Sequence, residues 1–416
     1  MAKTLVYQIW PGAWADLREI AYNLPKLASL GVDYVWLSPI YPSPGYDHGY
    51  DVADYCNINR RYGTISSFDQ FVATAHRYGI KVLMDLVLNH TSIEHPWFVS
   101  HPEYYVWRDA PIPGWHNLFD EGSCWKQYGS RYYLHLFHER QADLNWFSGD
   151  ALNDALVNEF RHIVKFWIQG HNVDGFRLDC PQAINKDFGR VELGFSNLLG
   201  GDKAIRVINA IFDDTPRPLC TTSGEKPLLI TELFDPTYGD LVAEYADCTP
   251  IDFVQNVIVK DAIEEGLDFL LMRIDQSVVA PAFMLDLESH DSVRFTSHSG
   301  LSLDEILPIL FSSKVQAVCL YQGQEMGLTN PDELHLPNPT LIALDARARM
   351  QYERGVSIDE IRANARSNAR IRHPINSLAI QFNTPLSNFD KTRTAIHHWK
   401  AGADAKRPPS IGQILR

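Results

Sequence analysis

The chain has 416 residues, of which 45% are hydrophobic and 12% aromatic, a composition that suits a large packed core and not a disordered chain. Its formal charge of -14, from 37 basic and 51 acidic residues, argues against a polyanionic partner, because phosphate backbones recruit an excess of Lys and Arg. We therefore expect no nucleic-acid partner and a neutral or cationic substrate.

Two further features bear on the compartment. The apolar run before Pro11 is too short for a signal peptide, and no stretch reaches transmembrane length, which predicts a cytoplasmic protein without a membrane partner. The six cysteines are scattered, with no CxxC pair and no Cys/His cluster at zinc-ligand spacing. We expect reduced thiols and no disulfide bonds.

Short apolar runs rich in β-forming residues recur along the chain with amphipathic stretches between them, a pattern typical of parallel strands joined by helices. Among the connecting helices, residues 16–30 end at Gly31 and residues 67–78 end at Gly79. Eight strand-helix units in one chain predict an α/β fold, a (β/α)8 TIM barrel. The expected strands cover residues 6–10, 34–37, 82–88, 175–178, 228–231, 251–254, 282–285 and 315–321.

One connection is far longer than the few residues usual in such folds. About sixty residues separate the third expected strand from the helix that starts near Asp150. We expect residues 91–149 to form a small excursion domain over the mouth of a catalytic barrel made of residues 1–90 and 150–372. An eighth helix is expected within residues 338–365. Residues 373–416 are assigned to a C-terminal tail, which leaves a C-terminal β-domain reduced or absent.

Polar side chains follow four of the expected strands. Chemistry in such barrels collects at the C-terminal strand ends. Taken singly, each of these residues also has a structural explanation, as a helix cap, an ion-pair partner or a buried core residue. Together they bring acids, two histidines and an arginine to one end of one barrel, and burying so many like charges is costly unless a site uses them. The segments are Asp85-Leu-Val-Leu-Asn89-His90, Gly175-Phe-Arg177-Leu-Asp179, Thr231-Glu232 and Ser289-His290-Asp291-Ser-Val-Arg294.

Carboxyl groups that face one another across a cleft can hydrolyse a glycosidic bond, with one as nucleophile and the other as acid and then base. The arginine two residues before Asp179 helps to keep that carboxyl ionised. A less solvated acid beside other negative charges has a raised pKa and holds a proton near neutral pH. A divalent metal site is the alternative, but Arg177 lies among the acids and no Asp-rich loop accompanies them.

These segments resemble the signature of glycoside hydrolase family 13, the α-amylase family. The resemblance runs from about residue 5 to residue 330, and Gln141-Ala-Asp-Leu-Asn145 is most similar to the oligo-1,6-glucosidase and α-glucosidase group. The segments similar to the family's nucleophile, third-strand, acid and seventh-strand motifs are Asp174-Gly-Phe-Arg-Leu-Asp179, Asp85-Leu-Val-Leu-Asn-His90, Leu229-Ile-Thr-Glu232 and His290-Asp291.

The resemblance implies a role for each matching residue. It makes Asp179 the nucleophile, Glu232 the acid/base and Asp291 the stabiliser that grips the sugar's hydroxyls. It implies that Tyr50 stacks on the glucosyl ring. An ion pair between Asp47 and Arg294 would seal the pocket end, so that the enzyme attacks chain ends. Further contacts with the sugar are implied for His90, Arg177, His290 and, as part of the wall, Phe119.

Two departures from the family pattern limit the interpretation. The loop at residues 11–16 lacks the spaced Asp and Asn residues that bind calcium in many relatives, so we expect no metal and no cofactor. Cys180 follows the nucleophile where relatives that prefer 1,6 or 1,4 linkages tend to carry Val or Thr, so the linkage stays open.

Three functions remain in competition. The first is a retaining α-glucosidase that acts on terminal α-glucosyl units of short α-glucosides through a covalent glucosyl-enzyme intermediate. The second is an α-glucosyltransferase, or a sucrose-cleaving or sucrose-isomerising enzyme, on the same scaffold. The third is a catalytically inactive amylase-like binding protein. The many Trp and Tyr residues of segment 91–149 suit either sugar stacking or a small core of their own, and the oligomeric state is not indicated.

Overall fold

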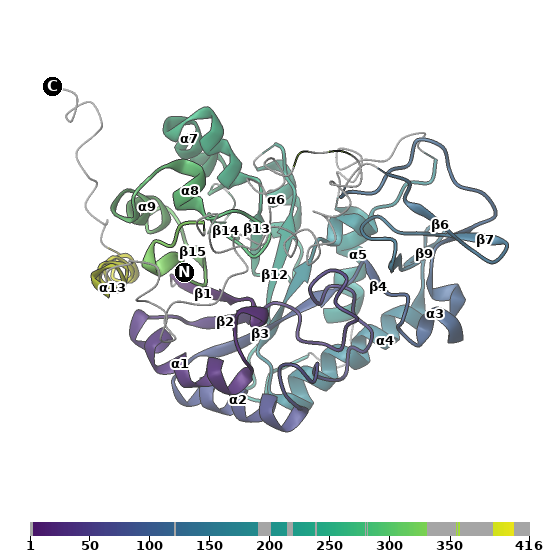
Figure 1. The fold of residues 1–416 in the computed structure, drawn as a ribbon, viewed down its shortest axis with the longest axis horizontal. Coiled ribbons are helices and arrows are strands. Elements are labelled where there is room, and N and C mark those ends of the chain that lie inside the picture. The colour runs from purple at the N-terminus through teal and green to yellow at the C-terminus, as the bar shows by residue number, and fades with distance from the viewer. Residues whose placement is uncertain are drawn as a thin grey trace.

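The computed structural model places the eight expected strands in one closed parallel barrel (Figure 1). It describes residues 3–119, 122–189, 201–213, 219–237, 239–278, 280, 282–330, 355, 357 and 386–402. The barrel closes because β1 pairs in parallel with both β15 and β2. Each observed strand overlaps an expected one, so the predicted fold is confirmed. The strands are β1 Thr4–Ile9, β2 Tyr34–Leu37, β3 Lys81–Val87, β11 Gly175–Asp179, β12 Leu228–Leu233, β13 Phe253–Asn256, β14 Phe283–Asp286 and β15 Ala317–Tyr321.

Side chains that alternate along the strands fill the interior of the barrel. Because successive side chains of a strand point to opposite faces, residues i and i+2 share the interior face. One interior layer is apolar and includes Val6, Trp36, Leu83, Ile230, Met284, Ala317 and Cys319. Two residues further along, four of these strands carry Gln8, Asp85, Glu232 and Asp286, and the neighbouring strands β11 and β13 add Arg177 and Gln255. The interior therefore changes from apolar to polar toward the C-terminal strand ends.

Helices surround the barrel (Figure 1). The side chain of Asp16 accepts hydrogen bonds from the first backbone N–H groups of α1, which ends at Gly31 in the left-handed conformation. A capping box between Thr64 and Ser67 starts α2. The two expected helices at 16–30 and 67–78 are thereby confirmed. The helices are α1 Leu17–Leu30, α2 Ile65–Arg77, α3 Trp97–Ser100, α4 Asp154–Lys165, α5 Asp202–Phe212, α6 Asp240–Ala246, α7 Leu267–Ser277, α8 Phe295–Ser299, α9 Leu303–Leu310 and α13 Leu386–Lys400.

The long connection after β3 carries small antiparallel sheets. Its aromatic residues pack on one another: the ring centroid of Phe98 lies 5.3 to 5.6 Å from those of Tyr105, Trp107 and Tyr133. No described Trp or Tyr of segment 91–149 lines the cavity described below, which favours the small core over sugar stacking. Whether this segment is a domain of its own stays a prediction. The strands are β4 His90–Ser92, β5 Trp107–Arg108, β6 Trp125–Tyr128, β7 Arg131–Leu134, β8 Gln141–Asp143, β9 Phe147–Ser148 and β10 Ala151–Leu152.

Helix α13 lies in the segment that we assigned to a tail, yet it packs on the barrel beside α1 and α9. Trp399 is fully buried and donates a hydrogen bond from Nε1 to the carbonyl of Val315, at 3.0 Å. The Lys400 ammonium pairs with Asp33 at 2.6 Å. Burial of the indole anchors this helix, so residues 386–400 belong with the outer ring. The eighth helix expected within 338–365, and the expected lack of a C-terminal β-domain, concern residues outside the described part.

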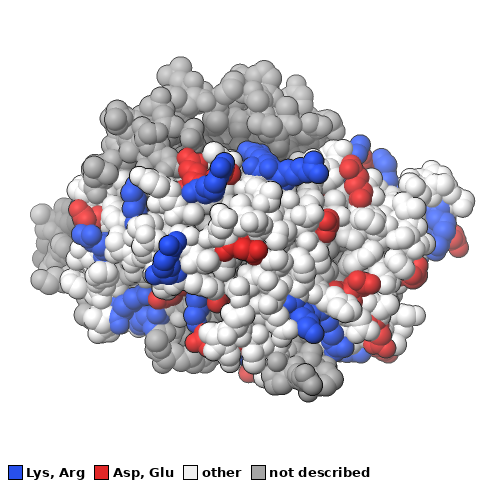
Figure 2. All heavy atoms as spheres, turned by 90° about the horizontal axis from the view of Figure 1, so that it is seen from below, with Lys and Arg blue, Asp and Glu red and all other residues white. Residues whose placement is uncertain are grey.

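The surface carries charge of both signs. Figure 2 shows Lys and Arg interspersed with Asp and Glu on the described part of one face. All six cysteines carry free thiols. Within the described residues, no helix has the length and apolar character needed to cross a bilayer.

Candidate active site

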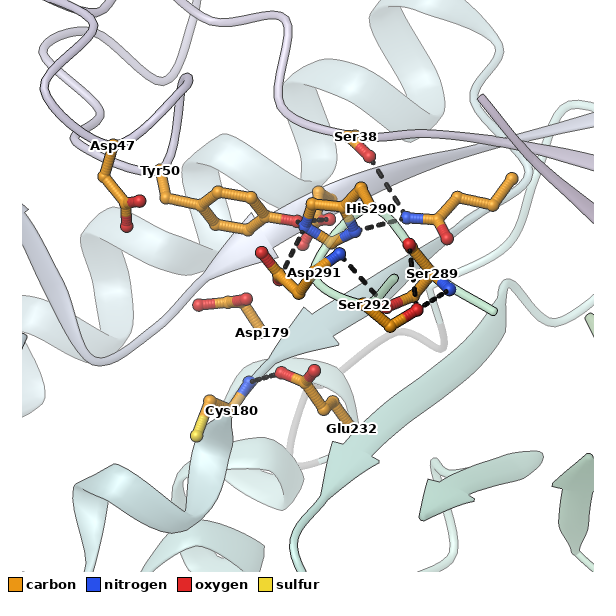
Figure 3. A network of polar contacts seen from close by, with 12 residues as sticks. Ser38, Asp47, Tyr50, Asp179, Cys180, Glu232, Ser289, His290, Asp291 and Ser292 are labelled. Atoms are coloured by element: carbon orange, nitrogen blue, oxygen red, sulfur yellow. Dashed lines mark hydrogen bonds and ion pairs between the residues drawn. The ribbon is translucent and has the colours of Figure 1, made fainter. Parts of the chain in front are cut away.

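A cavity of about 420 Å³ opens at the C-terminal ends of the barrel strands. Asp179 ends β11, Glu232 lies near the end of β12, and Asp291 follows β14, so the three predicted acids reach the same space from different strands (Figure 3). The other sequence-predicted residues that line the cavity are Asp47, Tyr50, His90 and Phe119.

The Arg177 guanidinium lies beneath the acids and is only 1% exposed. Its Nη1 donates to Asp179 Oδ1 at 2.6 Å and to Asp85 Oδ1 at 3.0 Å, and its Nη2 pairs with Glu232 Oε1 at 2.7 Å. One positive charge thus faces three carboxyl groups. If all three were ionised, the cluster would carry an uncompensated buried negative charge, which is costly.

Burial raises the pKa of both Asp179 and Glu232, while Arg177 acts in the opposite direction on each. The negative charges of Glu232 and Asp85 raise the pKa of Asp179 further, and that of Asp291 does the same for Glu232. We expected Arg177 to keep Asp179 ionised. It does favour the ionised form, but the effect of burial is larger, so the pKa of Asp179 is raised.

The backbone turns sharply after β11. Cys180 has φ 35° and ψ 54°, in the left-handed region that few residues with a Cβ adopt. Its N–H donates to Glu232 Oε2 at 3.0 Å (Figure 3). The turn thereby ties the second acid to the residue that follows the first. Cys180 also lines the cavity, where it adds an uncharged thiol, since burial raises its pKa well above the ordinary value.

His290 connects the wall of the cavity to Asp291. The side-chain amide of Gln8 lies 2.6 Å from His290 Nδ1, and His290 Nε2 lies 2.9 Å from Asp291 Oδ2 and 2.6 Å from Tyr50 Oη. If the Gln8 N–H donates to Nδ1, the network assigns the hydrogen to Nε2, which then donates to Asp291. The Tyr50 ring stacks on the imidazole with centroids 5.2 Å apart, which holds both groups in place.

Gln141 lies behind two residues that line the cavity, Asp47 and His90. Its Nε2 donates to Asp47 Oδ2 at 3.0 Å and lies 3.0 Å from His90 Nε2. Burial lowers the pKa of His90 to about 4, so this ring is neutral at pH 7. The Phe119 ring lies 5.6 Å from that of Phe137, which also lines the cavity. The arrangement offers hydrogen-bonding groups and apolar faces together, as small-molecule binding sites do.

Sequence comparison places this site in a known family. Residues 10–217 match the family described as alpha amylase, catalytic domain. A glucan 1,6-alpha-glucosidase of Streptococcus pneumoniae is 31% identical over 408 residues, which cover 88% of this chain and 74% of that enzyme. The chain belongs to the α-amylase family.

Two further members of the α-amylase family match over shorter stretches. The trehalose-6-phosphate hydrolase of Escherichia coli is 40% identical over 204 residues, 44% of this chain and 36% of that enzyme. The oligo-1,6-glucosidase of Bacillus cereus is 38% identical over 209 residues, 45% of this chain and 36% of that enzyme. The matched part of this chain thus spans little more than a third of either relative.

Solved structures of similar proteins extend the likeness in fold. The trehalose-6-phosphate hydrolase of Bacillus licheniformis superposes with a TM-score of 0.76 at 25% identity, over 96% of this chain and 82% of that one. The isomaltulose synthase from Erwinia rhapontici reaches a TM-score of 0.81 at 22% identity, over 96% of this chain and 83% of that one. The likeness in fold thus extends beyond the residues that the family model matches.

Three sequence-predicted site residues do not line the cavity, namely Arg177, His290 and Arg294. The ion pair expected for Arg294 also differs. Arg294 was expected to pair with Asp47 across the pocket end. Its Nη1 instead pairs with Glu288 at 3.0 Å and donates to the carbonyl of Gln322 at 2.8 Å, and it does not line the cavity. Glu288 lies six residues earlier on the same turn of chain after β14 and is itself buried, so it neutralises the arginine behind the cavity wall.

Sequence reasoning missed four residues that shape the α-amylase-family site. Asp85 is fully buried and accepts hydrogen bonds from Tyr50 Oη at 2.9 Å and from Arg177. Because Asp85 lies two residues after Leu83 on the same strand, the alternation of side chains could have predicted that it points into the barrel. Gln141 and Cys180 stood in recognised segments without an assigned role. Phe137 lies in a loop and carried no signal in the sequence.

Proposed function

We propose that the chain is a retaining α-glucosidase that acts on terminal α-glucosyl units of short α-glucosides through a covalent glucosyl-enzyme intermediate. The observation that carries this proposal is the shared contact of Asp179 and Glu232 with one guanidinium. Two carboxyl groups that touch the same Arg177 lie close together. Retaining enzymes need a separation of about 5 to 5.5 Å, whereas inverting enzymes need about 6.5 to 9.5 Å to admit a water.

The proposed reaction has two steps. Glu232 donates its proton to the glycosidic oxygen as the bond from that oxygen to C1 breaks, and an Asp179 oxygen forms a bond to C1. Glu232 then accepts a proton from water, the water oxygen attacks C1, and the bond to Asp179 breaks. Asp291, oriented by His290, would hold the sugar hydroxyls through both steps.

Support for short substrates comes from the size of the cavity. A volume of about 420 Å³ is near the lower end of the range for ligand pockets, roughly 300 to 1,000 Å³. Asp47, His90 and Gln141 are linked by hydrogen bonds at one end, which favours a terminal sugar unit. The expected ion pair of Asp47 with Arg294 does not support the preference for terminal units, because Arg294 pairs with Glu288.

The charges around the cavity favour an uncharged leaving group over a phosphorylated one. Of the two basic side chains on its outer wall, Lys260 is bound to Asp261 at 3.0 Å and to the carbonyl of Val257 at 2.7 Å, and His298 lies 3.7 Å from Glu264. Acids outnumber bases among the lining residues, so the field in the cavity repels an anion. We therefore favour the neutral α-glucosides that some relatives' names indicate over trehalose 6-phosphate.

Three alternatives stay under test. Transfer to a sugar acceptor shares the first step of the proposed reaction, and so does the cleavage or isomerisation of sucrose. The fold shared with isomaltulose synthase favours the reactions of sucrose. A catalytically inactive binding protein would keep the fold and lose the reaction. A cytoplasmic location remains our proposal from the sequence.

The test is a product analysis on isomaltose, maltose, trehalose, sucrose and trehalose 6-phosphate, each with and without a glucose acceptor. We expect glucose of retained anomeric configuration from neutral disaccharides and at least tenfold lower kcat/KM on the phosphorylated one. The double variant Asp261→Asn/Glu264→Gln should reduce the difference in kcat/KM between neutral and phosphorylated sugars, because it removes two negative charges from the outer wall. An inverted anomer, or preference for the phosphorylated sugar, would overturn the proposal.

A further inference from the structure

Gln141 is a fully buried residue that touches the cavity wall from behind and does not line the cavity. It contacts two residues that do line it, Asp47 and His90. Asp47 lies in the loop after β2, whereas His90 begins β4, just after β3. Gln141 itself begins β8, late in the long connection after β3. One side chain therefore links this connection to both wall residues.

Backbone contacts fix the direction of the Gln141 amide. The backbone N–H of His138 donates to Gln141 Oε1 at 2.9 Å, and the backbone N–H of Gln141 donates to the carbonyl of His138 at 2.8 Å. Because the amide oxygen is engaged in this way, the amide nitrogen faces the cavity wall. Its Nε2 lies 3.0 Å from Asp47 Oδ2 and 3.0 Å from His90 Nε2. The two hydrogens of Nε2 can serve one acceptor each, the carboxylate of Asp47 and a ring nitrogen of His90.

Amide groups beside both ring nitrogens favour an uncharged His90. Gln141 Nε2 faces its Nε2, and Asn89 Nδ2 lies 3.2 Å from its Nδ1. Lys186 donates to Asn89 Oδ1 at 2.6 Å, which leaves the Asn89 nitrogen for the ring. A protonated imidazole would point an N–H at each of these donors. The geometry thus agrees with the effect of burial, which lowers the pKa of His90 to about 4 with support from Lys186 and against Asp47.

The turn before Gln141 also holds the residue before Asp47. Arg140 Nη1 donates to Tyr46 Oη at 2.6 Å, and the guanidinium lies 4.2 Å from the centroid of the Tyr46 ring. The His138 ring stacks on Tyr46 with centroids 5.8 Å apart and planes 9° apart. The buried Asp51 accepts hydrogen bonds from the backbone N–H groups of Tyr46 and Asp47, at 2.9 and 3.1 Å. The loop after β2 is therefore fixed by its own carboxylate and by the long connection.

We propose that Gln141 is a positioning residue that shapes the sugar-binding end of the cavity by holding Asp47 and a neutral His90 in fixed places. This inference rests on the proposed function for the identity of the sugar. Asp47 offers a carboxylate and His90 a ring nitrogen to hydroxyl groups of the terminal unit, so the long connection acts on affinity through one amide. The charged and titratable groups around this contact are Asp47, Asp51, His138, Glu139, Arg140 and Lys186.

The first test compares kcat/KM of Gln141→Glu and Gln141→Met with wild type at the same pH. At pH 5 the new carboxyl shares a proton with Asp47 or His90 and keeps one hydrogen bond of the amide, so we expect a value within about threefold of wild type. At pH 8 two carboxylates repel each other, and the loss should reach about tenfold or more. The Met variant donates no hydrogen bond and should lose about tenfold at every pH, through KM more than kcat. A loss in Gln141→Glu by one factor at every pH, or a Met variant equal to wild type, would overturn the proposal.

A matched control is Asn256→Asp, which changes another buried amide into a carboxyl. Asn256 ends β13, is 1% exposed and does not line the cavity. Its side chain exchanges two hydrogen bonds with the backbone of Asp235, each at 3.0 Å. This variant should lose stability and keep the shape of the wild-type pH profile. The same recovery at low pH in Asn256→Asp would show that any new buried carboxyl causes it, and would overturn the assignment to Gln141.

Two measurements separate this inference from the proposed function. In nitrogen-15 NMR of labelled histidine, with the His90 signal assigned by its absence in His90→Gln, the pKa of His90 should rise by about one unit or more in Gln141→Glu, because a carboxylate replaces the amide beside the ring. In calorimetric titration, glucose should bind about tenfold more weakly to Gln141→Met than to wild type. An unchanged His90 titration, equal affinity for glucose or no glucose binding by wild type would overturn the inference. These readouts decide it even if no α-glucoside is turned over, a result that would sink the proposed function alone.

Discussion

Two buried arginines at the same end of the barrel differ in how their charge is balanced. Arg177 and Arg294 are each 1% exposed, and each guanidinium lies 4.9 Å from the centroid of an aromatic ring. Arg294 pairs with the carboxylate of Glu288, whereas Arg177 faces three carboxyl groups of the described residues, two of which line the cavity. A balanced pair has a structural role. A cluster short of positive charge has carboxyl groups with raised pKa values, a property that acid catalysis can use.

The largest expected effect is on activity, when an acid of the Arg177 cluster is removed without loss of stability. Asp179→Asn and Glu232→Gln should each lower kcat by about 10²-fold to 10⁴-fold or more, because each removes a reacting group. Neither should lower the melting temperature, since each relieves repulsion between buried carboxyl groups. Steady-state kinetics and calorimetry on the same samples test both parts. Near-normal turnover in either variant would refute the mechanism.

At the balanced pair, the expected effect lies on stability. Arg294→Met leaves Glu288 buried without its cation and should lower the free energy of unfolding by about 3 to 5 kcal/mol. Denaturant unfolding measures this loss. The double variant Arg294→Met/Glu288→Gln should recover much of it, because no charge is left unpaired. If the double variant remains folded but its KM rises tenfold or more, Arg294 helps to form the pocket end, as the family resemblance implies.

The smallest expected effect concerns metal removal. Lys186 is buried and its ammonium lies 2.6 Å from Asn89 Oδ1, 2.7 Å from the carbonyl of Ala183 and 3.1 Å from Asp143 Oδ2. The ammonium group of Lys186 thus occupies a cluster of oxygen atoms of the kind that binds calcium in other proteins. Prolonged dialysis against a chelator should therefore change neither kcat nor the melting temperature. A loss that calcium restores would contradict the expectation.

Local sequence determined much of this protein. Apolar runs marked all eight barrel strands, and capping residues such as Asp16 and Gly31 marked helix ends, because these signals act over a few residues. The positions of Asp179, Glu232 and Asp291 directly after or at the ends of strands predicted that they would meet, since parallel strands end together. The alternation of side chains along β3 and β14 could also have predicted that Asp85 and Asp286 point into the barrel, although we did not use it.

Only the tertiary structure decided which charges neutralise one another. Arg294 had acids within reach on both sides, and its pairing with Glu288 depends on how the turn after β14 folds against β15. The return of residues 386–400 to the barrel depends on where Trp399 can be buried. Spacing along a chain sets which face a side chain takes, but ion pairs, burial and pKa shifts arise from distances between segments that only packing brings together.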